Sequence, residues 1–128
     1  MAEKTAATEQ FSIREFPDRG ICCLSVDGDL SFDGRKDFSR FFGNLLASPR
    51  EKLVIDMTRL ERIVSVYLGT LVDCHKRATE RNKTLTVLIP PKLQQTFKVF
   101  GIDKAVQIIA IEPKPEASQT SAVISKIG

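Results

Sequence analysis

Residues 53–71 read LVIDMTRLERIVSVYLGTL, and this stretch decides the fold. It opens on a short, continuous apolar run at 53–57, which is typical of a central β-strand covered on both faces. A loop is predicted for 58–63. Apolar residues then recur at helical spacing, which predicts a helix over about 65–81. Its inward stripe is predicted to consist of Leu68, Leu71, Val72, His75 and Ala78.

Two strands and a helix are predicted upstream of this stretch. Residues 11–16 alternate apolar and polar side chains and predict an edge strand, and 21–26 form a β-rich apolar run. The turn sequence PDRG at 17–20 joins them into a hairpin. Residues 33–47 predict an amphipathic helix. Its apolar stripe is Phe38, Phe41, Phe42, Leu45 and Leu46.

Downstream, the pattern predicts two more strands with a helix between them. Residues 85–89 form a buried strand that ends at a Pro-Pro pair. A helix over 92–100 follows and points Leu93, Phe97 and Phe100 inward. Gly101 is placed to cap it in a left-handed conformation. Residues 106–111 form the last strand.

The order β-β-α-β-α-β-α-β predicts an α/β fold, with a mixed, mostly parallel sheet and helices packed on it. We expect residues 1–10 to be disordered, 11–112 to form one domain, and 113–128 to be a flexible tail. The predicted core contains Phe38, Phe41, Phe42, Leu45, Leu53, Ile55, Leu71, Leu85, Val87 and Phe97.

Composition narrows the class of protein. The chain has 128 residues, 42% hydrophobic and 27% charged, which is an ordinary globular balance. A net charge of +3 is small and scattered, so no nucleic-acid partner is expected. There is no apolar run long enough to span a membrane and no apolar signal core, so we expect no direct membrane insertion. Three cysteines that cannot all pair suggest reduced thiols and a cytoplasmic location.

The sequence offers no catalytic or cofactor motif, and neither an enzymatic activity, a metal site nor a cofactor is expected. Cys74 and His75 are adjacent on a predicted helix, so their side chains diverge by about 100°. Asp27, Asp29 and Asp33 lack calcium-loop spacing. A turn followed by a helix N-cap explains these three aspartates more simply.

Several segments together resemble the STAS domain family, the anti-sigma factor antagonists and their relatives. The strand 53–57 with its Asp56, followed by Ser65 through Gly69 at a helix start, is similar to the family's strand, loop and Asp-Ser-Ser/Thr-Gly-Leu-Gly motif. Gly28-Asp29-Leu30 resembles its Gly-x-Leu, and 93–106 its closing helix, glycine turn and last strand. The resemblance covers about 11–112.

In the family, a serine in this motif is phosphorylated by the partner anti-sigma kinase, and Ser65 matches it. Val64 stands where the family has Asp, and Val66 stands where it has a second hydroxyl residue. Tyr67 replaces the family's Gly, and Ser31 replaces another acidic residue. Valine can neither orient a hydroxyl nor accept its proton, so the sequence predicts impaired or absent phospho-switching. The alternative is that Ser65 only N-caps the helix.

The carboxyl ends of parallel strands gather at one sheet edge, where open α/β sheets place their sites. We therefore expect a partner-binding surface at this edge, with Tyr67 either an exposed anchor or packed on the loop. Its residues are Asp29, Ser31, Phe32, Val64, Ser65, Val66, Tyr67 and Leu68.

The resemblance implies a protein–protein interaction module that binds an anti-sigma factor, a serine kinase-like protein or a related regulator, and a homodimer is possible. Two alternatives remain open. One is a STAS accessory subunit of a bacterial membrane lipid-transport complex. The other is a small-ligand or nucleotide site at the helix N-terminus, which the missing glycine-rich loop disfavours.

Overall fold

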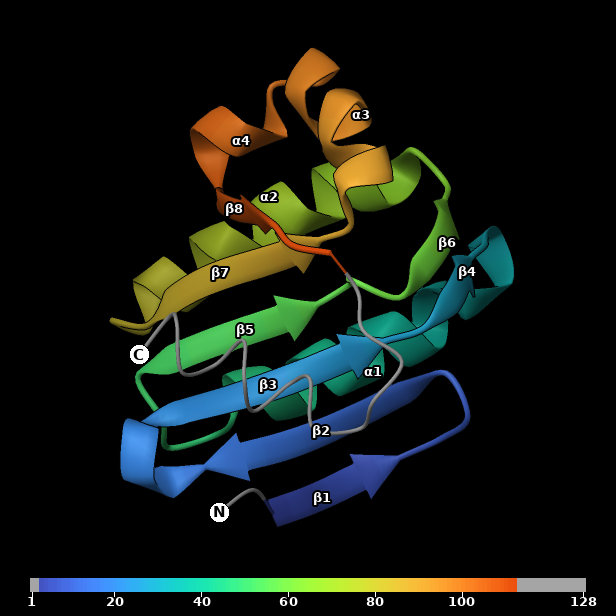
Figure 1. Ribbon diagram of the computed structural model, residues 1–128. Coiled ribbons are helices and arrows are strands. Elements are labelled where there is room, and N and C mark those ends of the chain that lie inside the picture. The colour runs from blue at the N-terminus through green and yellow to red at the C-terminus, as the bar shows by residue number, and fades with distance from the viewer. Residues whose placement is uncertain (1–2, 113–128) are drawn as a thin grey trace.

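A six-stranded sheet forms the centre of the computed structural model, which describes the backbone of residues 3–112 and side chains from residue 8 onward. Its strand order is β1-β2-β3-β5-β7-β8 (Figure 1). The strands are β1 Glu3–Ala7, β2 Phe11–Phe16, β3 Ile21–Val26, β5 Lys52–Asp56, β7 Thr84–Ile89 and β8 Gln107–Ala110.

The sheet is mixed, and most of its strands are parallel. β1, β2 and β3 pair antiparallel, whereas β3, β5, β7 and β8 pair parallel. Helices α1 (Arg35–Leu46) and α2 (Val66–Glu80) lie side by side on one face, α1 behind β2 and β3 and α2 behind β5 and β7 (Figure 1). The predicted α/β class and mostly parallel sheet are confirmed.

A second, two-stranded sheet lies beyond the carboxyl ends of β3 and β5. In it, β4 (Gly28–Leu30) pairs parallel with β6 (Leu60–Ile63). The prediction of a loop over 58–63 is therefore wrong for 60–63. The apolar pattern of the sequence does not reveal this strand, because Glu61 and Arg62 are polar and exposed and only Leu60 is buried.

Two short helical pieces replace the single predicted helix over 92–100, and a third follows it. They are η3 (Pro91–Leu93), α3 (Gln94–Val99) and α4 (Ile102–Ala105). Gly101 adopts φ 72°, the left-handed conformation that favours glycine, and it separates α3 from α4. Because α3 ends at Val99, the side chain of Phe100 points outward and is 58% exposed, so its predicted inward position is wrong.

The core lies between the sheet and the helices α1 and α2. All ten predicted core residues are buried, each less than 4% exposed. Phe11 of β2 stacks on Phe41 of α1 with ring centroids 5.3 Å apart. The predicted α2 stripe is shifted, because Tyr67 and Cys74 are buried whereas Val72 and His75 are only half-buried.

The two ends of the chain differ from expectation or lie outside the description. Residues 1–10 are not disordered throughout, because Glu3–Ala7 forms β1 and pairs with β2. Consequently β1, and not the strand at 11–16, is the edge strand. The predicted flexible tail at 113–128 lies outside the described residues. Within the described chain, no helix is both long and apolar enough to cross a bilayer.

Truncating Phe41 tests the packing of α1 on the sheet. Phe41→Ala is expected to lower the free energy of unfolding by about 3–5 kcal/mol, because it removes a buried ring and leaves a cavity. Phe32→Ala removes a ring that is 58% exposed and is the matched control. Urea unfolding should place the control within about 0.5 kcal/mol of the parent. Similar losses in both variants would contradict the observed packing.

Candidate functional site

The start of α2 is held beside the β4 turn by backbone hydrogen bonds. β4 and β6 pair through Leu30 and Ile63, and the Val64 N–H donates to the Leu30 carbonyl at 3.0 Å. Ser31 and Ser65 each follow directly on these residues. The structure thus brings together the two segments that the sequence placed at one sheet edge.

An Asp turn steers the chain from β5 into β6. The carboxylate oxygen Oδ1 of Asp56 accepts from the Thr58 N–H at 3.0 Å and from its hydroxyl at 2.7 Å. This is an Asx-type turn. Met57 still donates its N–H to the Leu88 carbonyl at 2.8 Å. Asp56 and Thr58 are buried, so their role is to shape the backbone of the site.

Tyr67 joins the two halves of the site from inside. Its hydroxyl donates to the Ser31 carbonyl at 2.6 Å, and its ring meets Phe38 edge-on at 5.4 Å between centroids. Only 1% of Tyr67 is exposed, and Leu68 is also buried. The prediction that these two side chains contact a partner is therefore wrong, because the helical phase of α2 turns both toward the core.

The other predicted residues form a surface, which we call the α2-start surface. Its members are Asp29, Ser31, Phe32, Val64, Ser65 and Val66. All are exposed except Val64, which is half-buried. Phe32 is 58% and Val66 36% exposed. The Arg35 guanidinium lies 5.2 Å from the Phe32 ring centroid and partly supports it. A serine hydroxyl and two apolar side chains thus face solvent on a fixed backbone.

Ser65 does not cap α2 with its side chain. Its φ of −57° and ψ of −24° are already helical, and its hydroxyl makes no capping hydrogen bond. A capping serine normally adopts an extended conformation. The Ser65 carbonyl instead accepts from the Leu68 N–H at 3.0 Å. The N-cap interpretation of Ser65 is therefore wrong, and its hydroxyl remains exposed.

Gln10 is a member of the site that the sequence did not reveal. Its side-chain amide donates to the carbonyls of Asp27 at 3.0 Å and Asp29 at 2.5 Å. These bonds fasten the β4 turn to the residue that precedes β2. A lone glutamine in a polar N-terminal stretch carries no pattern that could predict this contact.

The three aspartates near β4 do not gather into a cation site. Among the described residues, no group of three or more His, Cys, Asp or Glu side chains could hold a metal ion. Burial raises the pKa of Asp27, whereas the charge of Arg59 opposes this shift. Asp33 lies within η2 (Phe32–Gly34) and not at its cap, so the predicted capping role is wrong.

A double-mutant cycle tests the Tyr67 bridge. Tyr67→Phe removes its hydrogen bond to Ser31 and is expected to cost about 0.5–1.5 kcal/mol of unfolding free energy. A Cβ on Gly34 would lie 3.2 Å from the Tyr67 hydroxyl oxygen. In the Tyr67→Phe background, Gly34→Ala is expected to raise the free energy of unfolding by about 0.4–1 kcal/mol. In the parent protein the same substitution should be less favourable, because the added Cβ meets the Tyr67 hydroxyl. Equal effects in both backgrounds would contradict this geometry.

The cysteine thiols provide a pH-dependent test. Burial, and secondarily the charge of Asp73, raises the pKa of Cys74 to about 12. At pH 8 its thiolate fraction is then about one in ten thousand. Cys22 and Cys23 are also buried with raised pKa values. Ellman's reagent should find no fast thiol at pH 8 and three after unfolding. Rapid native labelling of Cys74 would contradict its burial.

Titration should also weaken the fold at high pH. A folded-state pKa above that of the unfolded chain means that the neutral thiol is favoured in the fold. This contribution of Cys74 is complete below about pH 9 and is lost as the pH rises toward its folded pKa of about 12. Unfolding free energies measured over this range should fall less steeply in Cys74→Ala than in the parent.

These features define a small α/β domain with an exposed, partly apolar surface at one edge of its sheet. A family model described as "Mlab, STAS domain" matches residues 18–110, well over half of the chain. The chain therefore belongs to the STAS domain family, as the sequence pattern predicted. No curated protein sequence matches it significantly.

Solved structures with the same fold cover nearly the whole chain. An anti-sigma factor antagonist from Mycobacterium paratuberculosis has TM-score 0.65 and 17% identity, covering 98% of this chain and 93% of its own. A putative anti-sigma factor antagonist from Thermotoga maritima has TM-score 0.63 and 16% identity, covering 98% and 95%. Phosphorylated SpoIIAA from Bacillus has TM-score 0.54 and 12% identity, covering 96% and 99%. At these identities the likeness establishes the fold alone.

Proposed function

We propose that the chain acts by binding another protein through the α2-start surface, as an anti-sigma factor antagonist-like regulator. Its partner is an anti-sigma factor or a related regulatory protein. Membership of the STAS family supports this proposal, as do structural neighbours described as anti-sigma factor antagonists. Its site of action is the cytoplasm, in keeping with three free cysteines.

One observation carries the proposal: the exposed Ser65 hydroxyl lies next to exposed apolar side chains at a rigid helix start. Burying Phe32 and Val66 in a complex would remove apolar area from water. The backbone beneath them is fixed by the Val64–Leu30 and Tyr67–Ser31 hydrogen bonds. Preorganisation of this kind lowers the entropy cost of association.

Phosphorylation at Ser65 would be compatible with the fold but would alter the surface. A phosphate adds nearly two negative charges, which the N-terminus of a 15-residue helix tolerates. The same charges would oppose burial against an apolar partner. However, Val64 and Ser31 stand at the family's acidic positions, so no carboxylate is supplied there to assist phosphoryl transfer. Binding without efficient switching is therefore our proposal for this chain.

The same substitutions favour a second candidate, an accessory subunit of a bacterial membrane lipid-transport complex. A permanently assembled subunit needs an apolar contact and has no need of a switch. Val66, exposed beside Ser65, fits such a contact. The identity of the bound partner separates the candidates, because recovery of an anti-sigma factor would support the regulator, whereas recovery of a permease or its ATPase would support the accessory subunit.

Charge substitution at Ser65 tests the proposed surface. Ser65→Glu should weaken partner binding by about 1–3 kcal/mol, because it buries a poorly paired charge in the contact. Ser65→Ala should leave affinity nearly unchanged. Gln95→Glu adds the same charge at an exposed position of α3 and serves as the matched control.

The measurement is isothermal titration calorimetry with the partner recovered by affinity purification. Circular dichroism first establishes that each variant is folded. If folded Ser65→Glu binds as tightly as Gln95→Glu, the α2-start surface is not the contact, and the proposal fails.

A further inference from the structure

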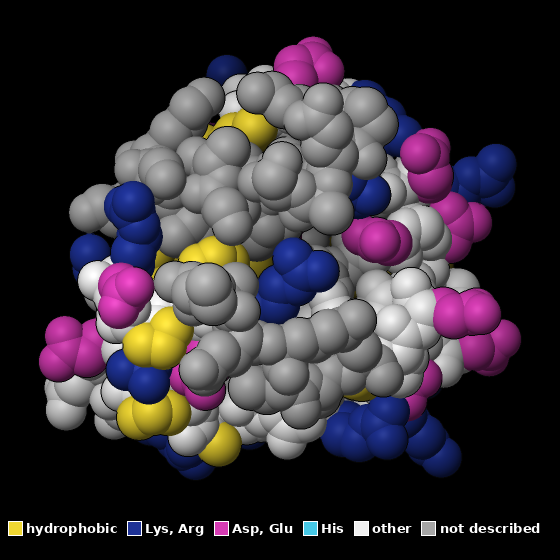
Figure 2. Space-filling view, turned by 60° about the horizontal axis from the view of Figure 1, so that its bottom comes forward, with side chains coloured by type: hydrophobic (Ala, Val, Ile, Leu, Met, Phe, Trp, Pro, Cys, Tyr) yellow, Lys and Arg dark blue, Asp and Glu magenta, His cyan; other side chains and the backbone are white. Residues whose placement is uncertain are grey.

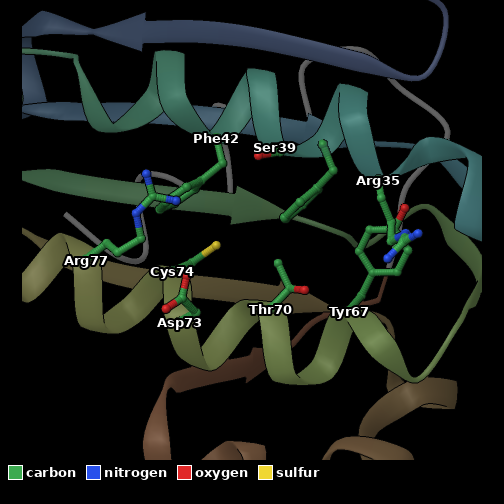
Figure 3. A pocket seen from close by; sticks show the side chains of 9 residues that line it. Arg35, Ser39, Phe42, Tyr67, Thr70, Asp73, Cys74 and Arg77 are labelled. Carbon is green, nitrogen blue, oxygen red and sulfur yellow. The ribbon is translucent and has the colours of Figure 1, made fainter.

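A groove between α1 and α2 lies outside the α2-start surface and has a chemistry of its own. It encloses about 220 Å³. This equals about seven water molecules at roughly 30 Å³ each. Figure 3 shows its side chains projecting from both helices into the space between them. The lining residues are Arg35, Phe38, Ser39, Phe42, Tyr67, Thr70, Asp73, Cys74 and Arg77.

The two ends of the groove are cationic. Arg77 lies at one end and Arg35 at the other, beside Tyr67 (Figure 3). The Arg77 guanidinium is 5.6 Å from the Phe42 ring centroid, and the Arg35 guanidinium is 5.2 Å from that of Phe32. Among the described residues, neither arginine has a carboxylate within ion-pair distance. Both guanidiniums are thus oriented by aromatic rings but not neutralised.

The middle of the groove is mostly apolar. The rings of Phe38 and Phe42 and the Cys74 side chain are buried and form its floor. Burial keeps the Cys74 thiol neutral, with a pKa raised to about 12. The Thr70 hydroxyl is occupied, because it donates to the Val66 carbonyl at 3.1 Å. A ligand lying between the two arginines would therefore contact hydrocarbon beside the exposed Ser39.

We propose that this groove binds an elongated organic dianion with two acidic ends and an apolar middle. Arg35 is seven residues before Phe42, over whose ring Arg77 lies, and the backbones of these two residues are about 10 Å apart along α1, which gives the scale of the groove. A carboxylate can accept paired hydrogen bonds from each guanidinium. Asp73 lies one turn before Arg77 and reduces the net positive charge at that end.

Octanedioate is a suitable probe because its two carboxylates are separated by six methylene groups. Tyr67 is the single tyrosine and tryptophan is absent, so tyrosine fluorescence reports on the surroundings of Tyr67, and the amide shifts locate the ligand in the groove. We expect saturable quenching or enhancement by millimolar octanedioate, with amide shifts confined to α1 and α2. Octanoate and 1,8-octanediol, which lack one and both charges, should bind about fivefold more weakly or worse.

Variants that lower or raise the net positive charge of the groove complete the test. Arg35→Gln and Arg77→Gln should each weaken octanedioate binding by about fivefold. Asp73→Asn should strengthen it. Arg40→Gln removes an arginine that also lies over a ring, 5.2 Å from Phe41, but does not line the groove, so it should change nothing.

The proposal is overturned by three results: no saturable response of Tyr67, equal affinity for octanedioate and the diol, or arginine variants that remain folded and bind like the parent. It is also overturned if the amide shifts map to α3 and α4 instead. These measurements use a small dianion and no partner protein, so the proposal of partner binding is tested separately.

Discussion

The hydrogen bond from the Tyr67 hydroxyl to the Ser31 carbonyl is the constraint on which the α2-start surface depends. It joins the first turn of α2 to the segment between β4 and α1, although the two residues are 36 positions apart in the sequence. The hydroxyl and carbonyl oxygens are 2.6 Å apart. The ring that carries this hydroxyl is itself fixed by Phe38 in the core. The buried Tyr67 ring thus holds the backbone at the two exposed serines, Ser31 and Ser65, in a fixed position relative to the core.

This arrangement also explains the departure at Tyr67 from the family motif. Glycine in that position would supply no hydroxyl and no ring, so the β4 segment would depend on Gln10 and the β4–β6 pairing alone. With tyrosine, the helix start is supported from beneath. The chain has exchanged small and acidic residues around Ser65 for apolar and aromatic ones. We interpret this exchange as favouring a lasting contact over a rapidly switched one.

Apart from the sites described above, the surface of the protein carries a mixture of positive and negative charges. On the face in Figure 2, positive and negative side chains are interspersed around the margin. Arg35 and Arg77 of the α1–α2 groove differ from this background, because they lie over aromatic rings and form no ion pair with any described residue. At the junction of α3 and α4, the large apolar side chains of Val99 and Phe100 are also exposed to solvent.

The sequence predicted strands β2, β3, β5, β7 and β8, a mostly parallel sheet, α1, α2 and the ten core residues, because these follow from periodicity and burial. It missed β4 and β6, where charged residues mask a short pairing, and β1, where a polar stretch pairs with β2. It placed Ser31 and Ser65 in neighbouring segments from topology. It could not place Tyr67 or Phe100, because one residue of helical phase, or one glycine break, moves a side chain from core to solvent.

Site-specific photo-crosslinking in cells would test the central claim that the α2-start surface binds a partner protein. A photoreactive phenylalanine analogue at Phe32 is compared with the same analogue at Phe100, because both side chains are 58% exposed and lie on different parts of the fold. The account predicts a discrete crosslinked protein from position 32 and none from position 100. Crosslinking to the same protein from position 100 alone would contradict it.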